Sequence, residues 1–153
     1  MKKSFVLILL LITIPGFNCN ETNTSGTENI TIEKLIREYS SVFDTKDFHK
    51  FSDYCADNMK FFTLDGQVFN KETMVPFLSR MVKQWQNMST SIEELEIETG
   101  NVLGWARYKQ VIHYSASGKD GTMNNLISIG LLKDLQTWKI GHFHMSTSYS
   151  KSR

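Results

Sequence analysis

The C-terminal half of the chain reads as four long β-strands in succession, and this pattern constrains the fold more than any other feature. Segments rich in β-branched and aromatic residues alternate with short stretches of turn-forming residues. The candidate strands are residues 93–99, 103–114, 123–133 and 138–148, and the turns between them are 100–101, 117–121 and 134–137. Strands joined by such short connections pair in antiparallel order. This half of the chain therefore predicts an antiparallel meander.

The N-terminal half shows the periodicity of helices instead. One apolar stripe with helical spacing runs from Ile32 to Phe43, with Thr31 as its predicted N-cap. The expected elements are helices over 32–43, 48–55 and 74–85, and short strands over 60–64 and 67–69 that flank the turn Asp65-Gly66. Helices gathered ahead of a meander predict an α+β domain.

The first residues have the composition of an export signal. Met1-Lys2-Lys3 is a basic start, and an apolar run of about ten residues follows from Phe5 to Ile14. Such a run is too short to cross a bilayer as a stable helix. We expect a signal peptide over residues 1–18 and, because residues 19–29 are polar, a flexible tether after it.

The junction of these two segments carries a second signal. Gly16-Phe17-Asn18-Cys19 resembles a bacterial lipobox, in the loose form typical of spirochaete lipoproteins. The resemblance implies that Cys19 is diacylated, and two acyl chains give stable membrane anchoring. The expected location is the inner or outer membrane of a bacterium, with the domain facing the periplasm or the cell surface. Secretion as a soluble protein is the alternative.

The charge balance excludes one class of partner. The whole chain has 17 basic and 16 acidic side chains, and loss of residues 1–18 removes Lys2 and Lys3 and no acid, which leaves a net charge of −1. Proteins that bind nucleic acid carry a basic excess on one face, so we expect no nucleic-acid partner. Acylation of Cys19 would leave Cys55 as the one free thiol, so we expect no intrachain disulfide.

Three segments together resemble a known superfamily. They are the break Asp44 to Asp47, the entry Ala56-Asp57-Asn58 into a strand, and the closing run from Trp138 to Ser146. Over residues 30–149, with 150–153 as a tail, the chain resembles nuclear transport factor 2-like or SnoaL-like domains. The resemblance implies a cone-shaped, curved antiparallel sheet wrapped round the N-terminal helices, a cystatin-like α+β barrel. It also implies a pocket in the wide end and a homodimer formed through the sheet.

The same resemblance implies which residues line the pocket. Their aromatic rings and few polar tips suit a small, mostly apolar ligand. They are Tyr39, Phe43, Tyr54, Phe77, Met81, Trp105, Tyr108, His113, Trp138, His142 and His144. The alternative is that these side chains simply fill the core.

Catalysis of the ketosteroid isomerase type is not expected. The resemblance puts Tyr39 at the position of the tyrosine that holds an oxyanion, but Thr63 and Ile129 stand where that chemistry needs two carboxyl groups. A threonine hydroxyl is no general base near neutral pH. The catalytic candidates that remain are His144, His142 and Tyr39.

Two of these candidates lie two residues apart in a predicted strand. Such residues point to one face, so we expect His142 and His144 to share a face with Trp138 and Ile140, with His113 on a nearby strand. Three histidines can hold zinc, but spacing alone is weak support and these strands offer no obvious carboxylate partner. We therefore expect no metal and no cofactor.

Two functions stay open from the sequence. The first is an exported, lipid-anchored module that binds a small ligand or another protein. The second is a small isomerase, cyclase or hydrolase that uses a pocket histidine and Tyr39. The sequence favours the first without excluding the enzyme.

Overall fold

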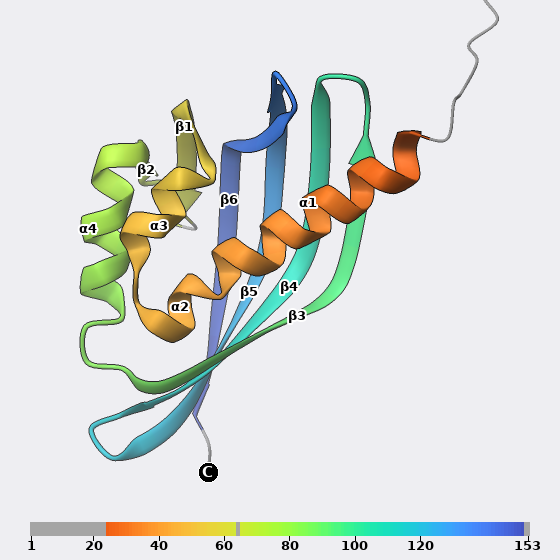
Figure 1. The fold of residues 1–153 in the computed structure, drawn as a ribbon. Helices are drawn as coiled ribbons and strands as arrows, with labels where there is room; N and C mark the ends of the chain where they lie inside the picture. Colours follow the sequence, from red (N-terminus) through yellow and green to blue (C-terminus); the bar gives the residue numbers. More distant parts are fainter. Residues whose placement is uncertain (1–23, 64, 152–153) are drawn as a thin grey trace, which may run out of the picture.

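The computed structural model describes residues 24–63 and 65–151, which form one six-stranded sheet with four helices on one of its faces (Figure 1). The helices are α1 (Thr24–Ser40), α2 (Val42–Thr45), α3 (Phe48–Asp53) and α4 (Lys71–Met81). The strands are β1 (Cys55–Thr63), β2 (Val68–Phe69), β3 (Gln86–Thr99), β4 (Leu103–Ala116), β5 (Lys119–Asp134) and β6 (Thr137–Lys151). The predicted α+β class is confirmed.

The sheet is curved and unclosed, with strand order β2-β1-β6-β5-β4-β3. Strands β3 to β6 pair as the predicted antiparallel meander, and β1 joins β6 in parallel. Helix α1 crosses the sheet obliquely, α3 and α4 cover the β1 side, and the bent β4–β5 hairpin reaches beneath α2 (Figure 1). The edge strands are β2 and β3, so one long side of β3 has no strand beside it among the described residues.

The strands extend further than the sequence predicted. Strand β3 begins at Gln86 rather than residue 93, and β5 begins at Lys119 because the turn before it is only two residues long. Ser117 and Gly118 have φ values of 53° and 73°, the left-handed pair that a tight hairpin turn requires. The predicted loop over 117–121 is therefore wrong.

Helix α1 also starts earlier than predicted, at Thr24 rather than after Thr31. The Glu28 carboxylate accepts from Lys133 Nζ at 2.6 Å and from Trp138 Nε1 at 2.5 Å, and Asn29 Oδ1 accepts from Thr99 at 3.1 Å. The prediction of a flexible tether is thus wrong for residues 24–29. Local composition could not show that these polar residues have partners about 70 to 110 positions away on the sheet.

Helix α4 begins with a capping box, in which the Asn70 and Thr73 side chains each bond the other's backbone N–H. Pro76 lies inside the helix, and α4 ends at Met81. Val82 and Trp85, predicted as helical, lie beyond its end and are still buried. The apolar stripe was therefore correctly predicted to be buried, but the predicted helix extended beyond its observed end.

The core fills the space between the helices and the sheet. Its largest fully buried side chains include Trp138, Tyr39, Phe48, Phe51 and Phe61. Aromatic rings meet edge to face, for example Phe43 and Phe48 with centroids 5.2 Å apart. This packing holds α1, α2 and α3 firmly against the sheet.

The predicted signal peptide over 1–18, the lipidation candidate Cys19 and residues 152–153 of the predicted tail lie outside the described residues. Within residues 24–63 and 65–151, no helix has the length and apolar character needed to span a membrane.

Candidate functional site

A bulge in β6 decides where the histidines lie. Ile140 pairs with Leu131 but His142 pairs with Gly130, so Gly141 is an extra residue between them. Phe143 and Met145 are consequently buried, and His142 and His144 are exposed. The prediction that both histidines share a face with Trp138 and Ile140 is wrong, because regular alternation breaks at Gly141.

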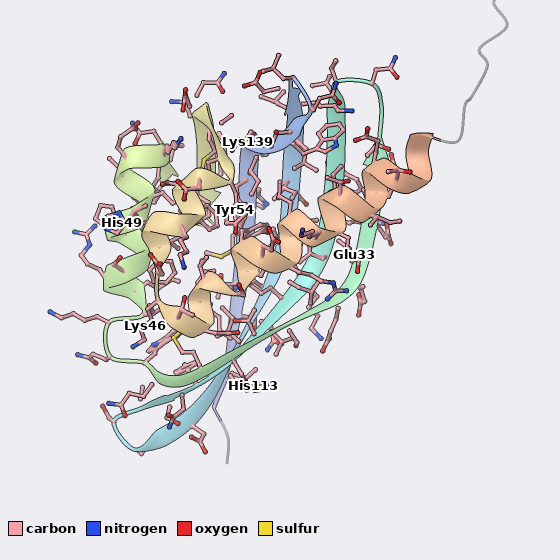
Figure 2. The ribbon with its side chains drawn as sticks, viewed as in Figure 1. Glu33, Lys46, His49, Tyr54, His113 and Lys139 are labelled. Atoms are coloured by element: carbon pink, nitrogen blue, oxygen red, sulfur yellow. The ribbon has the colours of Figure 1, made fainter. Side chains whose placement is uncertain are left out.

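The third histidine lies on the same outer face. His113, labelled in Figure 2, is exposed. Its Nδ1 lies 3.0 Å from the Thr122 hydroxyl. His142 packs on Phe62, with ring centroids 5.0 Å apart. Across the described part of the chain, no group of three or more His, Cys, Asp or Glu residues could hold a metal ion.

Tyr39 lies on the opposite face, under the helices. It is fully buried, with Phe51 and Phe143 at centroid distances of 5.2 and 6.0 Å. Burial raises the pKa of its hydroxyl well above the ordinary value. The structure therefore does not bring Tyr39 together with His142 or His144.

The other predicted pocket residues divide between the two faces. Phe43, Tyr108 and Trp138 are buried under the helices, and Tyr54, Phe77 and Met81 are partly buried against the same core. Trp105 lies on the outer face, where the Arg107 guanidinium sits 5.6 Å from its ring centroid. Of the eleven predicted lining residues, Trp105 and the three histidines are thus separated from the helix-covered interior.

A groove does open on the helix-covered side, between the α1–α2 junction and β3. It has a volume of about 300 Å³. Its lining residues are Arg37, Ser40, Ser41, Asp44, Thr90, Ser91 and Ile92, and we call it the serine groove. A second groove of about 400 Å³ shares Arg37 and continues along α1 past Glu33, which Figure 2 shows on the β3 side of the helix.

Five buried polar atoms lie under the helices without a hydrogen-bond partner among the described residues. They are Tyr39 Oη, Ser40 Oγ, Thr90 Oγ1, Tyr108 Oη and Gln110 Nε2, and we call these residues the polar cluster. Ser40 and Thr90 also line the serine groove. The Ser40 hydroxyl slightly lowers the pKa that burial raises at Tyr39, although the two hydroxyls do not meet hydrogen-bond geometry.

The other three residues of the cluster do not line the groove, but Gln110 lies fully buried on β4 beside the groove-lining part of β3. Ile92, which lines the groove, pairs with Gln110, and Tyr108 is the next inward residue on β4. Gln110 Oε1 accepts from Asn125 Nδ2 at 2.9 Å, and Asn125 Oδ1 accepts from the Thr147 hydroxyl at 2.8 Å. A polar row therefore crosses β4, β5 and β6 on the inner face of the sheet.

Comparison with known families decides the relationship of this chain. The family model of the SnoaL-like domain matches residues 32–150. The chain belongs to the SnoaL-like domain family. This range agrees with the domain expected over residues 30–149. A search of curated protein sequences finds no match.

Solved structures share the fold of this SnoaL-like domain at low sequence identity. A protein from Novosphingobium aromaticivorans named for scytalone dehydratase is 12% identical, with a TM-score of 0.73 over 83% of this chain and 89% of that one. A hexachlorocyclohexane dehydrochlorinase from Novosphingobium barchaimii is 8% identical, with a TM-score of 0.73 over 82% and 90%. An NTF2-like protein of unknown function from Pseudomonas putida is 17% identical, with a TM-score of 0.68 over 80% and 87%.

The interior of this SnoaL-like domain is polar in places but uncharged. Among the described residues, the buried polar side chains outside the aromatic and sulfur types are Ser40, Gln110 and Asn125, none of them ionisable. Asp44 supplies a carboxylate at the groove, whereas Arg37 is already paired with Glu33 at 2.7 Å. The interior therefore suits an uncharged molecule.

Cys55 takes no part in this site. Its thiol is buried and lies 3.3 Å from the Phe51 carbonyl oxygen, to which it donates. Burial raises the pKa of the Cys55 thiol to about 12, which keeps it protonated at neutral pH. It behaves as a core residue.

Sequence reasoning missed Ser40, Thr90, Gln110, Asn125 and Thr147 as site residues. One signal was available: Gln110 and Asn125 interrupt the apolar phase of their strands, where Tyr108, Ile112, Met123 and Ile127 hold the other inward positions. A polar residue in an apolar phase is found there only with partners or with a ligand. Ser40 gave the helical form of this signal, because it lies four residues after Ile36 on the apolar stripe of α1.

Proposed function

We propose that this protein binds a small, uncharged, mostly apolar ligand that enters by the serine groove and bonds to the polar cluster. The observation that supports it is the convergence of Ser40 and Thr90: both line the groove and both have buried hydroxyls with no partner in the described part of the chain. Ile92 supplies apolar contact in the groove, and Tyr39 and Tyr108 of the polar cluster carry aromatic rings. Binding sites commonly combine these two features.

Energetics favour an occupant at this site. A buried polar group without a partner costs about 1 to 3 kcal/mol, so each atom of the cluster that has no partner favours an occupant. A molecule with matching acceptors and donors removes that cost and gains hydrophobic contact. Water would satisfy the same atoms in the free protein and would leave when the ligand enters.

A ligand screen by thermal shift on the full chain tests this function. We expect neutral ligands of about 10 to 15 non-hydrogen atoms to raise the melting temperature, since the groove volume lies at the low end for ligand pockets. Thr90→Val should weaken the response by removing one hydroxyl at constant shape. Ser79→Ala, on the exposed side of α4, should leave it unchanged. No shift with any uncharged ligand class would contradict the proposal.

Catalysis at the same site is a second candidate function, and it is favoured by Asp44, which lines the groove. Two of the structural neighbours are named for a dehydratase and a dehydrochlorinase, which remove water or hydrogen chloride. In this candidate Asp44 accepts a proton from a substrate carbon, the electron pair of that C–H bond forms a carbon–carbon double bond, and the leaving group on the next carbon departs with its bonding electrons. Asp44→Asn should then abolish turnover but retain binding, whereas a protein that only binds its ligand shows no turnover with or without Asp44. The enzyme predicted from the sequence would use His142 or His144 as a general base together with Tyr39. These histidines lie on the opposite face of the sheet from Tyr39, so they cannot serve as that base.

Export and lipid anchoring through Cys19 remain part of the proposal and rest on the sequence. Processing at the lipobox would place the domain on a membrane, facing the periplasm or the cell surface. Metabolic labelling with a radioactive fatty acid tests it, with Cys19→Ala as the matched control. Labelling that persists in the variant, or that never occurs in a bacterial host, would contradict lipid anchoring at Cys19.

We also propose a homodimer formed through the outer face of the sheet. Leu126 is 63% exposed there, and the half-buried Trp105 lies on the same face. The charges around them are already paired within the subunit, Glu96 with Arg107 and Glu93 with Lys109. A second copy would cover this apolar strip, and these two ion pairs would already be formed within each subunit.

A further inference from the structure

We infer that one end of the domain lies against the lipid bilayer that holds Cys19, and that Val102, Leu103 and Leu135 contact lipid there. We call this end, residues 24–30, 100–103 and 134–137, the anchor end. It consists of the first turns of α1, the β3–β4 turn and the β5–β6 turn, and the β4–β5 turn lies at the other end of the strands (Figure 1). The inference rests on the proposed lipid anchoring and adds which surface of the domain faces the membrane.

Hydrogen bonds between its three segments hold the anchor end together. The Glu28 carboxylate accepts from Lys133 Nζ at 2.6 Å, beside the β5–β6 turn. Asn29 Oδ1 accepts from the Thr99 hydroxyl at 3.1 Å, beside the β3–β4 turn. The backbone N–H of Lys133 donates to the Val102 carbonyl oxygen at 2.9 Å and joins the two turns. The first turns of α1 and both strand turns therefore lie side by side.

Exposed apolar side chains gather at the anchor end. Six large hydrophobic side chains are exposed among the described residues, and four of them lie here. They are Ile30, Val102, Leu103 and Leu135, and each is at least 60% exposed. Single exposed apolar residues are ordinary on a protein surface, but a concentration of them marks a surface that binds a partner or a membrane.

The backbone at Leu135 gives independent support for an apolar partner. Leu135 has a φ of 55° in the two-residue turn between Asp134 and Thr137, a conformation that favours glycine or asparagine. The leucine gains no burial there, since it is 90% exposed. Neither packing within the domain nor the backbone favours leucine at this position, whereas contact with an apolar partner outside the domain does.

The short reach of the chain before α1 selects the bilayer as that partner. Five residue steps separate Cys19 from Thr24, and they span at most about 18 Å. The acyl chains on Cys19 would hold this residue at the level of the lipid headgroups. The start of α1 then stays close to the membrane surface, where exposed apolar side chains meet lipid at a high effective concentration.

The charges at the anchor end favour apolar contact over electrostatic attraction. Lys133 is already paired with Glu28, and Asp134 adds an exposed carboxylate beside Leu135. Attraction to anionic lipid headgroups therefore contributes little to the contact. Vesicles of uncharged phosphatidylcholine are the appropriate probe for this reason.

Quenching of a fluorescent label by spin-labelled lipid tests the contact. The lipid-modified protein is reconstituted in phosphatidylcholine vesicles that carry a nitroxide in the shallow part of the acyl chains. Gln136→Cys places the label beside Leu135, and Ser117→Cys places it in the β4–β5 turn, at the other end of β5. Cys55 is buried, so the introduced cysteine takes the label. We expect quenching at residue 136 to exceed that at residue 117 about threefold or more.

Leu135→Asn separates membrane contact from folding. Asparagine adopts a positive φ more readily than leucine, so the melting temperature should not fall, whereas quenching at residue 136 should fall by about half. Val68→Asn is the matched control and should leave this quenching unchanged. Val68 is also exposed, but it lies on β2 beside Phe62, which pairs with His144 in the middle of β6.

Flotation of the vesicles separates this inference from the anchoring on which it rests. If the protein does not float with the vesicles, anchoring and contact are both wrong. If it floats but both labels are quenched equally, anchoring stands and the contact is overturned. Weak quenching at residue 136 together with disulfide cross-linking of two copies through Gln136→Cys would assign the anchor end to a second copy instead. Quenching at residue 136 that persists in Leu135→Asn would overturn the contact of Leu135 with lipid.

Discussion

At residue 141 the absence of a side chain decides which face of the sheet carries the histidines. A Cβ at Gly141 would lie 2.7 Å from Leu132 Cδ1, closer than real Cβ atoms approach their neighbours. The bulge and the glycine are therefore linked: the extra residue fits only where nothing projects toward Leu132. This one position turns His142 and His144 outward and Phe143 and Met145 into the core.

Gly141→Ala should lower the free energy of unfolding by about 1 to 2 kcal/mol, because Leu132 must move to admit the methyl group. Urea denaturation measures this change. Gly26→Ala is the matched control with the opposite sign: no atom lies within 4 Å of its Cβ position, and alanine favours a helix by up to about 1 kcal/mol. Stabilisation by both substitutions would show that Gly141 is not sterically required.

Cys55 gives a prediction for the alkaline range. The unfolded thiol titrates near its ordinary pKa of 9.0, whereas burial raises the pKa of the folded thiol to about 12. Above pH 9 the unfolded state loses a proton that the folded state keeps, so stability from this group is full below pH 9 and falls as the pH rises. The slope approaches about 1.4 kcal/mol per pH unit.

Urea denaturation at pH 8, 9 and 10 measures this slope, and Cys55→Ala should reduce it. The same substitution also leaves a small cavity, so the comparison concerns the slope and not the absolute stability. An unchanged slope in the variant would assign the alkaline loss to other groups, of which the buried Tyr39 is the first candidate.

At the scale of the element, helix α1 consists of a polar N-terminal part and an apolar part that begins at Ile32. From Ile32 onward an apolar stripe faces the sheet, whereas the turns before it are polar and depend on the contacts of Glu28 with Lys133 and Trp138. Those hydrogen bonds lower the pKa of Glu28 below its ordinary value of 4.5. Their contribution to folding is therefore present above that value and is lost as the pH falls through the lower folded pKa.

Glu28→Gln should increase hydrogen exchange in the first two turns of α1 while the rest of the helix stays protected. Amide exchange measured by NMR or mass spectrometry shows the difference, and acidification below pH 4.5 should have the same effect in the native chain. Glu33→Gln, which breaks an exposed pair with Arg37, is the control and should leave this segment protected. Equal protection in all three proteins would mean that other contacts hold the N-terminal turns.

At the scale of the whole molecule, the two proposed functions lie on opposite faces of the sheet, a separation that the sequence did not predict. Its helix-covered face carries the serine groove and the polar cluster, and its outer face carries the three histidines with Trp105 and Leu126. A dimer through the outer face would leave the groove open at the β3 edge, because the groove lies on the other side. Ligand binding and association are thus expected to be independent.

Leu126→Arg should convert the proposed dimer to a monomer, since it puts a charge in the centre of the apolar strip. Light scattering coupled to size-exclusion chromatography measures the mass. Leu135→Arg is the control at a residue that is 90% exposed in the β5–β6 turn, and it should keep the native mass. A native chain that is monomeric at all concentrations would contradict the proposal.

Much of the fold could be predicted because each element carries its own local pattern. The stripe from Ile32 to Phe43 indicated a helix, and the alternating segments after residue 86 indicated an antiparallel sheet. The family likeness added the curvature, which local patterns do not contain. Boundaries failed where distant partners act, as at Glu28, or where a turn is tighter than its composition indicates, as at Ser117.

The site was less predictable for a physical reason. Tyr39 and Tyr108 were expected among the residues on the helix-covered side, and both are buried there. The prediction for His142 and His144 assumed regular alternation along the strand, which the bulge at Gly141 reverses. Gln110 and Asn125 matter through hydrogen bonds between strands, which depend on register rather than on neighbours in the chain.

The sequence by itself determined the class of fold, the order of its elements, the absence of a basic excess and the presence of an export-like start, because these depend on composition and local periodicity. Only the tertiary structure decided which face each side chain occupies and which buried polar atoms lack partners. Those properties arise where strands pair and helices cover them. Local sequence patterns therefore could not predict the bulge at Gly141 or the groove between α1 and β3.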